Sequence, residues 1–215
     1  MSLATGNLRK SIFVFHSLKT KAFLRLLLDT LFSMNQYYIL GRSLAPPLEY
    51  SFARMPKGDI SPLTENDITY LRRNISLLNE EDRRELLARL FFYESGFTNC
   101  YVMRNGTDIA YLQWIIFPSE NRVISQKYST KFNLLSDKQV MIENAFTFPN
   151  YRGRGYLPFG TQQLLELAKR NGYSSAICYI RTDRITSLNE FTKMGFKIVK
   201  MVDEYKLFGK AWRTL

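Results

Sequence analysis

The feature of this sequence that most constrains the fold is a glycine-rich turn between two segments of different periodicity. Residues 139–148 form a β-prone run, whereas residues 157–171 repeat apolar side chains at helical spacing. A second β-rich run follows at residues 173–182. A helix that joins two strands of one sheet has to cross over beside that sheet. Because the preceding residues indicate helices and an antiparallel hairpin, the sequence predicts an α/β fold around a mixed sheet.

The turn itself, residues 151–157, has the sequence Tyr-Arg-Gly-Arg-Gly-Tyr-Leu. Backbone N–H groups at the start of a helix have no partner within the helix, and the helix dipole there favours an anion. Glycine allows a ligand to approach the backbone closely, and arginine adds fixed positive charge. The turn therefore predicts a phosphate-bearing ligand, with a solvated β-turn as the alternative. The candidate binding residues are Arg152, Gly153, Arg154, Gly155, Tyr156 and Leu157.

Two common phosphate-binding motifs do not fit this turn. A Walker loop ends in Gly-Lys-Ser/Thr, which supplies a lysine for a transferable phosphate and a hydroxyl for magnesium. A dinucleotide fingerprint has the spacing G-x-G-x-x-G. Neither pattern occurs at residues 151–157, so the turn indicates a different class of phosphate ligand.

A second motif follows the β-rich run. The polar pair Asp183–Arg184 precedes a short helical segment that ends in Lys-Met-Gly-Phe at residues 193–196. Gly195 suits the left-handed position that commonly follows a helix, and Lys193 complements the negative end of the helix dipole. This segment therefore predicts a final helix that leads into another strand.

Together the two motifs resemble those of the GNAT superfamily of acyl-coenzyme A-dependent N-acetyltransferases. In that family an Arg-x-x-Gly-x-small turn after a strand holds the pyrophosphate of acyl-coenzyme A. Arg152 and Gly155 match the first two positions, and Leu157 stands where the family usually has glycine or alanine. The resemblance covers roughly residues 139–200. It implies a GNAT-like fold with acetyl-coenzyme A, or coenzyme A, bound as co-substrate.

The resemblance also assigns roles to neighbouring residues. It implies that backbone groups of Thr147 and Phe148 pair with the pantetheine arm in the manner of an extra strand. Ser187, at the start of the last helix, either contacts the pantetheine or caps the helix.

Two departures from the family pattern concern catalysis. The family often has a tyrosine, which protonates the leaving thiolate, at the position of Phe191. Asp183–Arg184 occupy the region of a family asparagine. Tyr179 and Tyr156 are the candidate substitutes for the missing acid.

Glu143 is the candidate catalytic base. It lies with Asn144 midway along the strand that leads into the turn. Acyl transfer to an amine needs a neutral amine and a polarised thioester carbonyl. A carboxylate at this place could remove a proton from the acceptor ammonium, directly or through water. The alternative is that Glu143 faces solvent or pairs with an arginine.

The charge distribution fits a polyphosphate ligand. The chain of 215 residues carries a net charge of +11, with 46% hydrophobic and 23% charged residues, which is ordinary for a folded protein. Residues 148–215 carry +7 and residues 1–60 carry +5, whereas residues 61–147 carry −1. The excess lies partly beside the predicted phosphate turn. No nucleic-acid motif is recognisable, so nucleic acid is not the expected partner.

Metal binding is not expected from the composition. The two cysteines, Cys100 and Cys178, lie in separate β-prone runs, and His16 is the single histidine. Metal sites of zinc type need clustered histidine and cysteine ligands. We therefore expect buried, reduced thiols and no metal site.

The chain is predicted to divide into an arm and a domain. Residues 1–45 form the arm, with a basic amphipathic helix over residues 18–33, and residues 60–215 form the acyltransferase domain. The helix is expected to pack on the domain, to contact a membrane surface or to form a dimer. No apolar run reaches the ~18 residues that cross a membrane, and no cleavable signal sequence is evident, so we expect a cytoplasmic protein.

The sequence thus predicts an N-acyltransferase that moves an acetyl group from acetyl-coenzyme A to a primary amine of a small molecule. A faint similarity to acetyltransferases of bacterial surface-polysaccharide synthesis makes an amino sugar a candidate acceptor. One rival is a catalytically impaired module that only binds coenzyme A. A second rival is a protein that binds membrane or nucleic acid through its basic arm. The acceptor, the acyl chain length, the general acid and the oligomeric state are not defined by the sequence.

Overall fold

Two parallel strands joined by a crossover helix, which residues 139–182 predict, lie at the centre of the sheet. The computed structural model describes residues 32–45, 56, 58–208 and 210–215. Its strands are β1 (Phe32–Ser43), β2 (Ser61–Pro62), β3 (Cys100–Asn105), β4 (Asp108–Ile116), β5 (Gln139–Thr147), β6 (Ser175–Arg181), β7 (Lys197–Leu207) and β8 (Lys210–Arg213). The α-helices of these residues are α3 (Glu65–Asn74), α4 (Glu80–Glu94), α5 (Asn121–Val123), α6 (Tyr156–Arg170) and α7 (Ile185–Lys193).

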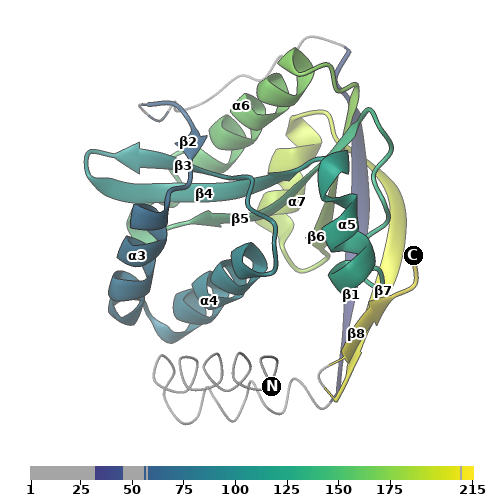
Figure 1. Ribbon diagram of the computed structural model, residues 1–215, viewed down its shortest axis with the longest axis horizontal. Helices are drawn as coiled ribbons and strands as arrows, with labels where there is room; N and C mark the ends of the chain where they lie inside the picture. The colour runs from purple at the N-terminus through teal and green to yellow at the C-terminus, as the bar shows by residue number, and fades with distance from the viewer. Residues whose placement is uncertain (1–31, 46–55, 57, 209) are drawn as a thin grey trace.

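The strands form an eight-stranded sheet in the order β2-β3-β4-β5-β6-β1-β7-β8 (Figure 1). Only β5 and β6 run parallel, and α6 connects them; every other neighbouring pair is antiparallel. The predicted hairpin is β3 and β4, joined at Asn105–Gly106. The predicted α/β class with a mixed sheet is therefore confirmed.

Strand β1 corrects the predicted arm. The sequence predicts that residues 1–45 form an arm that precedes the domain. In the structure, β1 covers 12 residues and lies between β6 and β7. Tyr37 is opposite Arg181 on one side and Val202 on the other. Both partners are distant in the sequence, so local periodicity does not reveal them. The predicted amphipathic helix at residues 18–33 lies almost wholly outside the described residues.

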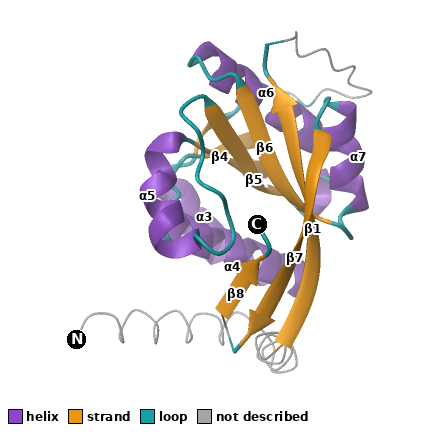
Figure 2. Cartoon of the chain, turned by 90° about the vertical axis from the view of Figure 1, so that its right-hand side faces the viewer, coloured by secondary structure: helices purple, strands orange, loops and turns teal. Residues whose placement is uncertain are grey.

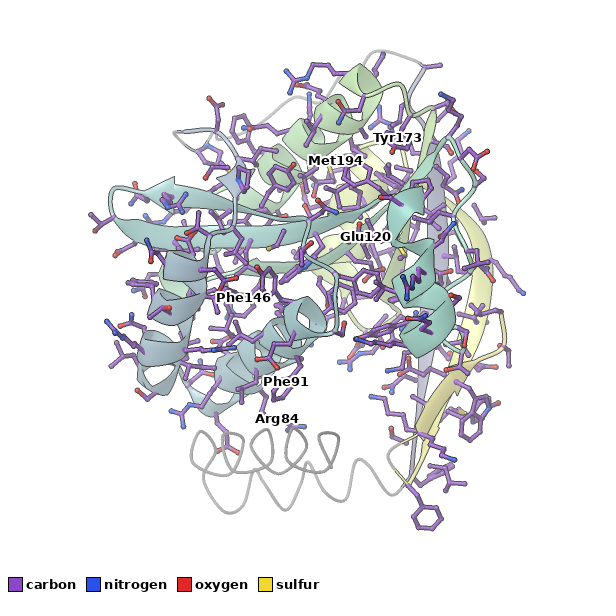
Figure 3. All side chains as sticks on the ribbon, viewed as in Figure 1. Arg84, Phe91, Glu120, Phe146, Tyr173 and Met194 are labelled. Atoms are coloured by element: carbon purple, nitrogen blue, oxygen red, sulfur yellow. The ribbon has the colours of Figure 1, made fainter. Side chains whose placement is uncertain are left out.

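Helices cover both faces of the sheet. On one face, α6 and α7 bury Leu164, Leu165 and Met194 against the strands. On the other face, α3 and α4 pack with Trp114 of β4 in a larger cluster. Figure 3 shows Met194 on the side of α6 and Phe146 of β5 on the side of α4. The sheet is therefore the middle layer of three, and its central strands are buried on both faces.

Local capping signals place the first two described helices. The Thr64 hydroxyl accepts the Asp67 N–H at 3.2 Å, and the Asp67 carboxylate accepts the Thr64 N–H at 2.8 Å. The Asn79 side chain caps α4 by accepting the Asp82 N–H at 2.9 Å. These side chains satisfy N–H groups that the helix cannot pair by itself, so they fix where both helices begin.

Strands β1, β7 and β8 continue beyond the helices as a ribbon (Figure 2). Their exposed apolar side chains include Phe32, Met34 and Trp212. No helix among the described residues has the length and apolar character needed to cross a bilayer.

Close packing of α6 on β4 depends on Gly160. A Cβ atom at this position would overlap the Tyr111 ring, whose Cδ1 atom would lie 3.0 Å away. Tyr111 is itself fully buried, and its hydroxyl donates to Gln113 at 2.6 Å. The ring cannot move aside without breaking that bond. Gly160 therefore sets how closely the helix that follows the phosphate turn approaches the sheet.

We expect Gly160→Ala to lower the free energy of unfolding by about 1–2 kcal/mol, because overpacking costs more than the gain in helix propensity. Urea denaturation measures the change. Glu166→Ala, on the exposed side of the same helix, is the control and should change stability by less than about 0.5 kcal/mol. Equal stability of Gly160→Ala and the wild type would contradict the packing argument.

Candidate functional site

The backbone of the predicted phosphate turn, residues 151–157, bends through two glycines. Gly153 and Gly155 adopt left-handed φ angles of 70° and 82°, which glycine reaches without strain. Gly155 is the N-cap of α6, and no side chain caps the helix. The first N–H groups of α6 therefore have no partner within the helix and none from a capping side chain. They are available to an anion.

A cavity of about 1050 Å³ lies between this turn, the first turns of α4 and the start of α7. It brings together most of the cofactor residues expected from the sequence. These are Thr147, Arg152, Gly153, Gly155, Tyr156, Leu157 and Ser187. We call it the loop cavity. Its size suits an extended ligand that is larger than a single phosphate.

Two of the expected cofactor residues do not line the loop cavity. The Phe148 side chain packs against the core beside Phe146, with ring centroids 5.0 Å apart, and its N–H bonds to the Ala110 carbonyl at 3.0 Å. The exposed Arg154 guanidinium lies 5.5 Å from the centre of the Tyr151 ring. Neither side chain faces the cavity that the rest of the turn encloses.

Acidic residues of α4 neutralise the arginines around the loop cavity. Arg152 forms an ion pair with the buried Asp82 and also donates to the Thr147 carbonyl at 3.2 Å. Arg184 pairs with Glu85. The positive charge of the turn is thus balanced by α4. The unpaired N–H groups, rather than net charge, are the main attraction for an anion in this state.

The N-terminus of α7 provides a second set of N–H groups. Its N-cap is Arg184, without a side-chain cap bond, and Thr186 and Ser187 line the loop cavity. Ser187 is the third residue of the helix, so it does not cap α7 as one alternative supposed. Two helix N-termini therefore open onto one cavity.

Strands β5 and β6 separate in the middle of the sheet. They pair only from Gln139 to Met141 on β5. Beyond that point the Glu143 carboxylate spans the gap and accepts the Tyr179 N–H at 2.9 Å. The next residue, Asn144, has a left-handed φ of 54°, and the pairing of β5 with β4 is irregular there. The sheet is thus open between its two parallel strands, with Glu143 at the point of separation.

Arg89 of α4 was not a sequence candidate, yet it lies at this opening. Its guanidinium donates to the Ala145 carbonyl at 2.8 Å and to the Glu85 carboxylate at 2.7 Å. It also lies 5.2 Å from the centre of the Phe146 ring. Only the helical pattern of α4 is visible in the sequence. Its approach to β5 depends on tertiary packing.

A second cavity, of about 450 Å³, adjoins the opening. We call it the acceptor-side cavity. Glu143 and Asn144 line it together with aromatic residues of β1, α4 and β6. The two cavities share five lining residues, so they meet at the separation of the strands. The shared residues are Glu85, Arg89, Ala145, Arg184 and Ser187.

The Glu143 carboxyl has a strongly altered acidity. Burial raises its pKa to about 7, although Arg213 and the Tyr179 N–H favour the ionised form. The side chain is half-buried and opens onto the acceptor-side cavity. Such a carboxyl exchanges its proton near neutral pH, which suits a general base.

The candidate general acids lie in different places. Phe191 is buried against Phe196, with ring centroids 5.0 Å apart, so this position supplies no proton. The Tyr179 hydroxyl accepts the Asn133 N–H at 3.2 Å and lines the acceptor-side cavity. Tyr156 lines the loop cavity. Burial raises the pKa of the Cys100 and Cys178 thiols, and no cluster of metal-binding side chains occurs among the described residues.

Comparison with known proteins rests on structure alone, because no protein-family model and no curated protein matches the sequence. A GNAT-family acetyltransferase from Colwellia psychrerythraea aligns with a TM-score of 0.55 and 10% identity, over 86% of this chain and 61% of that chain. A protein described as a GNAT-family acetyltransferase from Novosphingobium aromaticivorans gives 0.53 and 12%, over 84% and 64%.

A third similar structure is a glucosamine N-acetyltransferase region of a fungal multi-domain β-N-acetylglucosaminidase. It has a TM-score of 0.58 and 14% identity, over 84% of this chain and 22% of that chain. This chain has the GNAT fold. The fold that the two sequence motifs imply by resemblance is therefore confirmed. The chain spans less than two thirds of the length of each of these proteins.

The raised pKa of Glu143 predicts a pH-dependent stability. Its carboxyl ionises near pH 4.5 when unfolded and near 7 when folded, so the folded state loses stability as pH rises across this window. Glu143→Gln keeps an acceptor for the Tyr179 N–H and cannot ionise. The variant should therefore gain up to about 3 kcal/mol relative to wild type between pH 5 and pH 8, measured by urea denaturation. Parallel profiles for the two proteins would show that the carboxyl titrates normally.

Proposed function

We propose that the protein is an N-acyltransferase that transfers an acetyl group from acetyl-coenzyme A to a primary amine of a small molecule. The observation that carries the proposal is the opening between β5 and β6. It joins a cavity lined by free helix N-termini to a cavity lined by a carboxyl with a pKa of about 7. The two substrates would enter from opposite sides and meet at this opening.

The residues of the loop cavity fit the diphosphate of coenzyme A. The N–H groups of residues 153–157 would hold it, because left-handed Gly153 and Gly155 expose the backbone and no side chain blocks the helix end. Arg152 would contribute charge once its pairing with Asp82 is exchanged for phosphate. Thr147 and Ser187 line the way from the turn toward the opening, where the pantetheine arm would extend.

Glu143 would act on the acceptor amine. Its carboxylate is held by the Tyr179 N–H and faces the acceptor-side cavity, so it could accept a proton from an ammonium group. The neutral amine then attacks the thioester carbonyl directly, without a covalent enzyme intermediate. The departing thiolate takes the remaining proton of the amine. The Ser187 hydroxyl lines both cavities, whereas Phe191 has no proton to give.

An amino sugar is one candidate acceptor. The sequence has a faint similarity to acetyltransferases of surface-polysaccharide synthesis, and a glucosamine N-acetyltransferase region is among the structures with the same fold. At 14% identity, that structure supports the fold and not the substrate. Glucosamine therefore belongs in any panel of test amines, beside unrelated amines.

Calorimetry with coenzyme A and a thiol-release assay with a panel of amines test the function together. The proposal expects coenzyme A to bind and at least one amine to accelerate thiol release from acetyl-coenzyme A. Binding without release for every amine would instead favour the impaired coenzyme A-binding module. Failure of coenzyme A to bind would exclude both.

Gly155 and Gly172 provide a matched test of the phosphate turn. Both have left-handed φ angles, 82° and 81°, but only Gly155 lines the loop cavity. Replacement of either by alanine should cost about 1 kcal/mol of stability through backbone strain. Only Gly155→Ala should weaken coenzyme A binding, by about tenfold or more, because it displaces the N–H groups. Calorimetry measures the affinities. Equal affinities for the two variants would remove the turn from the binding site.

The pH dependence of turnover tests Glu143. A base has to be ionised, so kcat/KM should rise with pH through about 7 and then level off. The acceptor should be an amine with a pKa of about 10, so that its own ionisation lies outside this range. Glu143→Gln should lower kcat/KM about 100-fold and abolish the step near pH 7, with little change in coenzyme A affinity. A step that persists in this variant would assign it to another group.

A further inference from the structure

The charges around the acceptor-side cavity are mostly satisfied within the protein. Glu85 is paired with Arg89 at 2.7 Å, and Arg181 with Asp183 at 2.6 Å. The buried Glu204 pairs with Arg213 at 2.9 Å and lies 3.6 Å from Lys206. These pairs leave little net charge to recognise a ligand.

Two charged side chains of the cavity differ from the rest. Among the described residues, neither Glu143 nor Lys131 has a partner of opposite charge within ion-pair distance. The Glu143 carboxyl is held by a backbone N–H. The Lys131 ammonium lies 5.8 Å from the Tyr128 ring centre, and burial lowers its pKa. The cavity therefore presents one carboxyl group and one ammonium group to a ligand.

The wall that carries Lys131 is rigidly supported. The Arg213 guanidinium donates to the Lys131 carbonyl at 3.1 Å. It also stacks on Tyr37, at 3.9 Å from the ring centre, and lies 5.1 Å from that of Tyr179. Because Arg213 is almost fully buried and paired with Glu204, its own charge is not free for a ligand. It serves to hold the backbone of Lys131 against the aromatic side of the cavity.

The cavity is lined between these groups by aromatic rings from several elements. They belong to Tyr37, Phe92, Tyr128, Phe132 and Tyr179. Such walls exclude water and strengthen charge-assisted hydrogen bonds at the polar groups. An amine that carries no anionic group would leave the half-buried Lys131 ammonium with only Glu204, which is already paired with Arg213, as a counter-charge.

We infer that the acceptor is a small molecule that carries both a primary amine and an anionic group, a carboxylate or a phosphate. Its amine lies at Glu143, beside the opening between the strands. Its anionic group lies at Lys131, and its apolar part contacts the aromatic rings between them. This inference rests on the proposed function and narrows the class of its acceptor.

Matched pairs of amines test the inference. Phenylalanine is compared with phenethylamine, and glucosamine 6-phosphate with glucosamine, by thiol release from acetyl-coenzyme A. In at least one pair the anionic member should have a kcat/KM about tenfold or more above its neutral partner. The pair that shows this preference distinguishes a carboxylate from a phosphate.

Variants of Lys131 identify the group responsible. Lys131→Met should reduce the ratio between anionic and neutral partners to about one, through a rise in KM for the anionic member, and Lys131→Arg should restore most of the preference. Lys200→Met removes an exposed lysine of β7 that lines neither cavity, and it should leave the ratio unchanged. The inference would be overturned if the neutral and anionic members had equal kcat/KM in both pairs. It would also be overturned if Lys131→Met retained the preference for the anionic member.

Binding separates this inference from the proposed function. Calorimetry of the same four amines, in the presence of coenzyme A, should show the same preference and the same loss in Lys131→Met. Turnover of neutral and anionic amines alike would sustain the proposed function and reject the inference. Selective binding of anionic amines without any thiol release would sustain the class of ligand and reject the proposed function. Absence of binding by all four amines would reject the inference.

Discussion

The separation of β5 from β6 is the constraint on which the site depends. Two parallel strands that stayed paired would close the sheet and keep the loop cavity apart from the acceptor-side cavity. The Glu143 carboxylate occupies the gap and bonds to the Tyr179 N–H at 2.9 Å, so the strands remain linked while their backbones diverge. This position accounts for the raised pKa of Glu143, because burial between the strands disfavours the charged form. The same carboxyl thus shapes the opening and faces the acceptor side.

Helix α4 connects the two cavities electrostatically. Its Asp82 pairs with Arg152 of the phosphate turn, and its Glu85 pairs with both Arg184 and Arg89. A diphosphate in the loop cavity would compete with these carboxylates for the arginines. On binding, the arginines would therefore exchange carboxylate partners for phosphate. The N–H groups of the two helix ends, which have no partner before binding, supply the additional attraction. Figure 1 shows α4 below the sheet and α6 above it, so the pair of Asp82 and Arg152 joins elements from the two faces of the sheet.

Much of the structure around the loop cavity could be predicted from the sequence, because its signals are local. The phosphate turn, the crossover helix and the last helix each carry glycine or periodic apolar residues within a short stretch. The structure around the acceptor-side cavity could not be predicted, because its parts meet only through tertiary packing. Strand β1 pairs with residues more than a hundred positions away, Arg89 reaches β5 from a helix, and Lys131 contacts Arg213, which lies 82 positions further along the chain. Glu143 was visible as a polar residue in a strand, but its altered acidity depends on neighbours that no local pattern shows.

Backbone amide spectra recorded while coenzyme A is added test the central claim most directly. The account predicts the largest ¹H–¹⁵N shifts at residues 153–157 and at the start of α7, with smaller shifts along β5 where it departs from β6. Adenosine, which lacks the diphosphate, should leave the signals of residues 153–157 in place. Saturable binding of coenzyme A with shifts elsewhere, and none in the turn or at the opening between the strands, would contradict the account.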